Sequence, residues 1–126
     1  MEKFENLNEL IVALLLWITT HTEYKDPKKF PQIKFIEQKE LSEMACGREC
    51  EILALTPEVP KYTIFLSKSL SPMDDVCDRG ILLHELIHIL QEDQNVPYPV
   101  HFYHLYYLHP YYNLFLGLFV LFHCFF

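Results

Sequence analysis

The chain has 126 residues, enough for one domain with a single hydrophobic core but not for two. Apolar residues make up 51% of it and charged residues 21%, which excludes a disordered polypeptide. The formal net charge of −7 argues against binding to nucleic acid, because such surfaces depend on clustered Lys and Arg.

The N-terminal segment from about Phe4 to Thr20 has apolar residues at helical spacing and is predicted to be a helix. Its apolar run from Leu10 to Ile18 resembles the core of a secretory signal in length. Acidic residues precede the run, and no small-residue cleavage site follows it, so we interpret the segment as a helix of the domain. The expected location is therefore cytoplasmic.

The middle of the chain predicts three strands and one short helix. Alternating apolar residues, β-branched residues and breaker residues set their expected bounds. The first two elements are a strand from Gln32 to Glu37 and a helix from Lys39 to Ala45 that is stopped by Gly47. They are followed by a strand with apolar residues at positions 52, 54 and 55, which ends at Pro57, and by a strand from Tyr62 to Leu66.

Two of the four cysteines, Cys46 and Cys50, are separated by only three residues. Such a pair can close a local disulfide or remain two free thiols. A structural zinc knuckle has a shorter spacing and a second cysteine pair, and this chain has no second pair.

A long helix is predicted from Ser71 to about Asp93. Ser71 is expected to cap it, Pro72 suits its first position, and two aspartates follow at the positive end of the helix dipole. The residues expected to face the core are Val76, Cys77, Leu83, Ile87 and Leu90.

This helix carries the pattern His84-Glu85-Leu86-Ile87-His88. Histidines four positions apart project from one helix face and can take adjacent corners of a zinc tetrahedron. Glu85, between them, is placed to accept a proton from water activated by the metal. Chance could produce the bare pattern in a chain with seven histidines, but the uncharged flanks are those of a ligand helix buried on its other faces.

From Trp17 to about Gln94 the chain resembles an uncharacterised bacterial zincin-like family, a domain of unknown function with an HExxH helix. The matching segments are 17–24, 45–50, 62–66 and 81–91. The resemblance implies a compact α+β zincin with one short sheet, in which His84 and His88 bind zinc and Glu85 is the base. It also implies that the strand from Tyr62 to Leu66 is an edge strand beside the cleft, where a peptide substrate could pair.

The third ligand that a catalytic zinc site needs is not evident. A metzincin has Gly at position 91 and His at position 94, and this chain has Gln at both. A site completed by a glutamate from a later helix is excluded, because no carboxylate follows Asp93. His101 and His104 remain as candidates, and the alternative is that no third ligand exists.

Residues 97–126 contain no Asp, Glu, Lys or Arg but most of the aromatic residues. Three explanations stay open for this abrupt change. The segment is a foreign end produced by truncation or a frameshift, a membrane-associating helix over residues 105–126, or a hydrophobic helix that packs on the domain.

The sequence thus predicts a minimal α+β zincin-like domain over residues 1–95, followed by a hydrophobic aromatic tail over residues 96–126. The expected function is zinc-dependent hydrolysis of a peptide or protein substrate, with Glu85 activating water. The alternative is a catalytically inactive binding or membrane-associated module that lacks the third zinc ligand.

Overall fold

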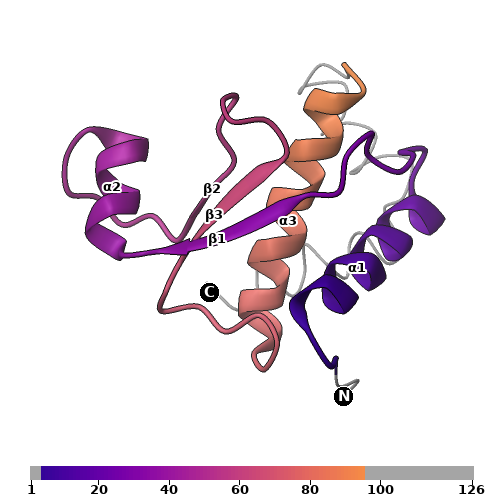
Figure 1. Ribbon diagram of the computed structural model, residues 1–126, viewed down its shortest axis with the longest axis horizontal. Coiled ribbons are helices and arrows are strands. Elements are labelled where there is room, and N and C mark those ends of the chain that lie inside the picture. Colours follow the sequence, from indigo (N-terminus) through magenta and orange to yellow (C-terminus); the bar gives the residue numbers. More distant parts are fainter. Residues whose placement is uncertain (1–3, 96–126) are drawn as a thin grey trace.

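The computed structural model describes residues 4–95, which form three helices and one three-stranded mixed sheet (Figure 1). In chain order these are α1 (Leu7–His21), β1 (Gln32–Ile36), α2 (Gln38–Cys46), β2 (Ala54–Leu55), β3 (Thr63–Ser67) and α3 (Val76–Asp93). The predicted α+β class and all six elements are confirmed, with shifts at their ends. The predicted tail and the boundary before it lie outside the described residues.

Helix α1 begins after Asn6, whose side-chain oxygen accepts a hydrogen bond of 2.9 Å from the backbone N–H of Glu9. At the other end, the Thr22 hydroxyl donates to the carbonyl of Ile18 at 2.7 Å. One face of the helix is buried and consists of Leu10, Ile11, Leu15 and Ile18. The N-terminal apolar run is therefore part of the domain core.

In the sheet, β3 lies between the other two strands, and the order is β1-β3-β2. It pairs in parallel with β1 and antiparallel with β2, and all five of its residues are buried. The expectation that this segment is an edge strand is therefore wrong. Its continuous apolar character reflects a central strand covered on both faces, and the edges are β1 and β2.

Helix α2 ends at Gly47, which adopts a left-handed conformation with φ of 67° and donates its N–H to the Glu43 carbonyl. The helix stop predicted from this glycine is confirmed. A disulfide joins Cys46, the last residue of α2, to Cys50. Of the two states predicted for this cysteine pair, the structure has the bonded one.

The start of α3 differs from the prediction. Residues 71–74 form a turn in which the Ser71 carbonyl accepts from the N–H groups of Asp74 and Asp75 at 3.0 and 2.9 Å. The helix is capped instead by Asp75, whose carboxylate accepts from the N–H groups of Cys77 and Asp78. Ser71 is too far before the helix to cap it, because the turn intervenes.

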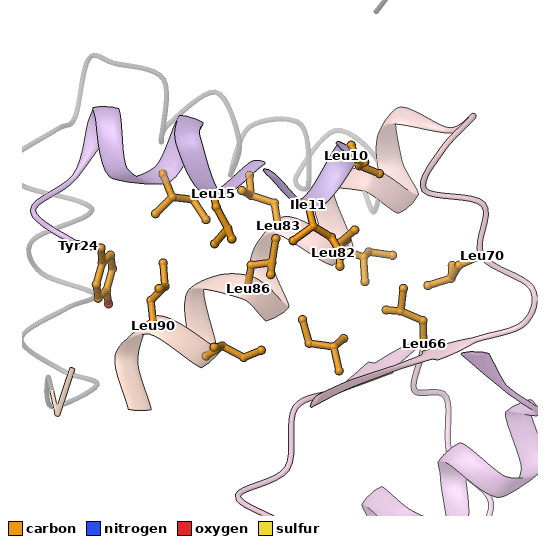
Figure 2. Packing of buried hydrophobic residues seen from close by; sticks show 14 residues of the cluster. Leu10, Ile11, Leu15, Tyr24, Leu66, Leu70, Leu82, Leu83, Leu86 and Leu90 are labelled. Atoms are coloured by element: carbon orange, nitrogen blue, oxygen red, sulfur yellow. The ribbon is translucent and has the colours of Figure 1, made fainter. Parts of the chain in front are cut away.

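The core lies between α1, α3 and the sheet. Figure 2 shows the buried side chains of α1 pointing toward Leu82, Leu83 and Leu86 of α3, with Leu66 of β3 on the other side. Leu83 and Leu90 are buried, as predicted. The expectation for Val76 is wrong: it is the first residue of α3 and is largely exposed.

Candidate metal centre

The two histidines of the motif lie one turn apart on α3, away from its buried leucines. Residues such as Leu82, Leu86 and Leu90 are fully buried and fix the helix against the core. His84 is exposed and His88 is half-buried. Their rings meet nearly at right angles, and the two Nε2 atoms are 3.0 Å apart.

This separation fits a shared metal ion. A zinc ion bound by two imidazoles at about 2.0–2.1 Å, with a tetrahedral angle between them, has ligand nitrogens about 3.3 Å apart. The Nε2 atoms of His84 and His88 already lie within a few tenths of an ångström of that spacing. The pair needs only a small opening to accommodate the ion.

Gln91 fixes the tautomer of His88. Its side-chain oxygen lies 2.9 Å from Nδ1 of His88, and an amide oxygen can only accept, so Nδ1 carries the proton. In the neutral ring, Nε2 of His88 then carries the lone pair, which in the metal-free protein accepts a hydrogen bond from His84. A partner on the second ring nitrogen is a typical feature of histidines that bind metals.

The pKa of His84 is lowered from its ordinary value of 6.5. Desolvation by the surrounding protein is the main cause, and the neighbouring His88 adds to it, whereas Glu85 acts in the opposite direction. The lowered pKa favours the neutral form of the ring, which is the form that can bind a metal ion.

Glu85 is the charged residue that the described part of the chain buries most deeply, with 8% of its surface exposed. Its Oε2 accepts a hydrogen bond of 2.5 Å from the hydroxyl of Thr56, which follows β2. A buried carboxylate is costly unless it is hydrogen-bonded, and buried ionisable groups beside clefts are candidates for function.

Glu85 and His88 line an open cleft of about 590 Å³ between α3 and the end of β2. Leu55 and Thr56 form the opposite wall. The charged residues in the lining are all acidic, namely Glu58, Glu85 and Glu92. A candidate base, one candidate ligand and the free edge of the sheet therefore share one cleft.

Among residues 4–95, no group of three or more His, Cys, Asp or Glu is arranged to hold a metal, so the structure adds no third ligand to the two candidates from the sequence. His101 and His104 lie outside the described residues. Near the end of α3, the side chains of Asp93 and Gln94 already have other partners. Asp93 accepts from the Tyr62 hydroxyl, which raises the pKa of Tyr62, and from the Lys28 backbone; Gln94 bonds to the Lys25 backbone.

Two residues of the site were missed by sequence reasoning. Gln91 stands three positions after His88, and this helical spacing could have indicated it. Thr56 is 29 residues from Glu85, and no local pattern points to it.

A family model described as a domain of unknown function, DUF6647, matches residues 3–105 of this chain. The match covers most of the sequence and reaches past the described residues to include His101 and His104. No curated protein and no solved structure matches the chain.

Proposed function

This chain belongs to the DUF6647 family, and we propose that it is a zinc-dependent metallohydrolase, most specifically a peptidase. His84 and His88 bind the metal in this proposal, and Glu85 is the general base. The observation that carries it is the 3.0 Å separation of the two Nε2 atoms on a helix whose buried Glu85 lines one cleft together with His88.

A zinc ion supplies Lewis acidity, which makes water a stronger acid and polarises a carbonyl group. Glu85 accepts the proton of the attacking water and delivers it to the leaving amine. The position of Glu85 between the two histidines and its contact with the cleft support this role. The low solvent exposure of Glu85 strengthens its electrostatic interactions with reacting groups.

The substrate in this proposal is a peptide or an unfolded segment of a protein. The cleft is open, and its wall includes Ala54 and Leu55 of the edge strand β2. An edge strand has backbone N–H and C=O groups free to pair with an extended peptide. This replaces the original expectation for the strand at residues 62–66, which lies in the middle of the sheet.

We propose His101 or His104 as the third ligand. The family match extends to residue 105, so both histidines belong to the region that the family shares. In the full-length protein, His101→Ala and His104→Ala are compared for zinc content. Loss of zinc in one variant identifies the ligand, whereas full zinc content in both variants and in the double variant rules both out.

The test of the main proposal is Glu85→Gln in the full-length protein. We expect one zinc ion per chain by elemental analysis and no hydrolysis of a library of internally quenched peptides. Glu92→Gln is the matched control, because Glu92 is a carboxylate on the same helix that lines the same cleft. Equal activity of the Glu85 variant and wild type would contradict the assignment.

The second candidate is a catalytically inactive module that binds a partner. The absence of a third ligand within residues 4–95 favours it. Wild-type protein that binds no zinc and hydrolyses no member of the peptide library even after zinc is added would support this candidate. Hydrolysis that is lost on chelation and restored by zinc would rule it out.

The location of the protein stays a prediction. Among residues 4–95, no helix is long and apolar enough to cross a membrane, and the segment 105–126 proposed for membrane contact lies outside them. The Cys46–Cys50 disulfide would be unusual in the reducing cytoplasm that we expected. Thiol labelling in intact cells, with and without prior reduction, measures whether Cys46 and Cys50 are bonded there. A bonded pair would argue for an oxidising compartment and against the cytoplasm.

A further inference from the structure

We propose that Thr56 is a positioning residue for Glu85, and this inference rests on the proposed function. Its hydroxyl holds one carboxylate oxygen, Oε2, so that the other oxygen is available to the cleft that Glu85 lines. Thr56 belongs to no recognisable sequence motif, and three features of the structure support its role.

The first feature is the hydrogen bond itself. The Thr56 hydroxyl oxygen lies 2.5 Å from Oε2 of Glu85 and 3.5 Å from the Glu85 backbone carbonyl. A hydroxyl has only one proton to donate. Of the two acceptors, the carboxylate oxygen is the nearer one, and a carboxylate accepts a stronger hydrogen bond than a backbone carbonyl. The proton therefore goes to the carboxylate, and this bond restrains the end of the side chain.

The second feature is the way in which the backbone holds Thr56. Leu55, just before it, pairs with Phe65 of the central strand β3, and Pro57 follows it. A residue before proline is restricted to extended conformations, and a β-branched side chain has few rotamers. Thr56 is thus a stiff donor at the end of the sheet, aimed at a helix residue 29 positions later in the chain.

The third feature is the environment of Glu85. Glu85 is buried as a residue, and no Lys or Arg within residues 4–95 forms an ion pair with its carboxylate. A glutamate side chain has three rotatable bonds, and fixing them costs entropy that the Thr56 bond offsets before the substrate arrives. A base held in place in advance is the kind of arrangement that raises the turnover rate.

The test compares two substitutions in the full-length protein. Thr56→Val keeps the shape of the side chain and removes the hydroxyl, whereas Thr56→Ser keeps the hydroxyl and removes the methyl group. We measure kcat and KM on internally quenched peptides, zinc content and thermal unfolding. For Thr56→Val we expect kcat to fall about 10- to 100-fold, with KM and zinc content close to wild type.

The serine variant should stay within about threefold of the wild-type kcat, because it retains the donor. A structural defect alone would lower the unfolding temperature or zinc content of both variants without this hydroxyl-dependent difference in kcat. If Thr56→Val does not fold, Thr56→Ala removes the same hydroxyl without placing a second methyl group against the carboxylate.

Each outcome decides between the two proposals. Wild-type kcat in the valine variant, or equal losses in the valine and serine variants, overturns the role of Thr56 and leaves the proposed hydrolase intact. If the wild type itself hydrolyses no peptide after zinc is added, the proposed function fails, and the role of Thr56 fails with it.

Discussion

Replacing Gln91 with leucine should weaken zinc binding although both proposed ligands, His84 and His88, are retained. Leucine is similar in size but cannot accept the hydrogen bond from Nδ1 of His88, which is 2.9 Å long in the wild type. That bond fixes the ring so that Nε2 has its lone pair available for the metal. Because the bond becomes stronger when the imidazole donates electron density to a cation, its loss should be felt more in the bound state than in the free state.

The magnitude follows from two contributions. One hydrogen bond between partly buried neutral groups contributes about 0.5–1.5 kcal/mol. A His88 ring without a fixed tautomer spends part of its time with Nε2 protonated, and an equal population of both tautomers costs about 0.4 kcal/mol. The sum of about 1–2 kcal/mol corresponds to an affinity for zinc about 5- to 30-fold weaker, which overlaps the effect of about 10- to 100-fold known for residues that hydrogen-bond a metal-binding histidine.

Competition with a chromophoric zinc chelator measures this affinity on full-length protein at constant pH. Gln91→Glu is the matched control, since it retains an acceptor and adds a negative charge, and it should bind zinc at least as tightly as the wild type. Circular dichroism checks that both variants remain folded. Equal affinity of the leucine variant and the wild type would refute the tautomer argument for His88.

Two further predictions test the electrostatics and the helix start. In metal-free protein the free energy of unfolding should decrease as pH falls below 6.5. The reason is that the folded-state pKa of His84 is lowered: between 6.5 and that pKa the unfolded chain takes up a proton and the folded one does not, while above 6.5 neither does. His84→Asn should flatten this slope in urea unfolding, and an unchanged slope would contradict the shift. Asp75→Ala should cost about 1 kcal/mol of stability as a lost helix cap, whereas Ser71→Ala should cost less; the reverse order would favour the cap originally predicted.

The sequence predicted best what depends on local periodicity. Helix α3 and the shared face of His84 and His88 follow from a repeat of 3.6 residues, and the structure has both. Gly47 likewise marks the end of α2, because few other residues adopt a left-handed conformation.

What escaped prediction depends on competition or on distant contacts. Ser71 and Asp75 are both good cap residues, and the turn at residues 71–74, which no simple pattern separates from a first helical turn, decided between them. The central position of β3 was also missed. Its apolar run is typical of a buried strand, but a sequence pattern does not say which strands lie on its two sides. The contact between Thr56 and Glu85 joins residues 29 positions apart and depends on the pairing of β2 with β3, which no local pattern reveals.

The placement of Glu85 shows why the sheet has to contribute to this site. On α3 the leucines at positions 82, 86 and 90 are buried in the core, and the histidines at 84 and 88 turn away from it. Position 85 is about 100° around the helix from position 84, which brings its side chain to the boundary beside β2 rather than into solvent. A carboxylate at that boundary loses water and needs a donor from the neighbouring element. The motif therefore places the two proposed ligands and the proposed base on one helix, whereas the orientation of Glu85 depends on a hydroxyl from the residue that follows β2.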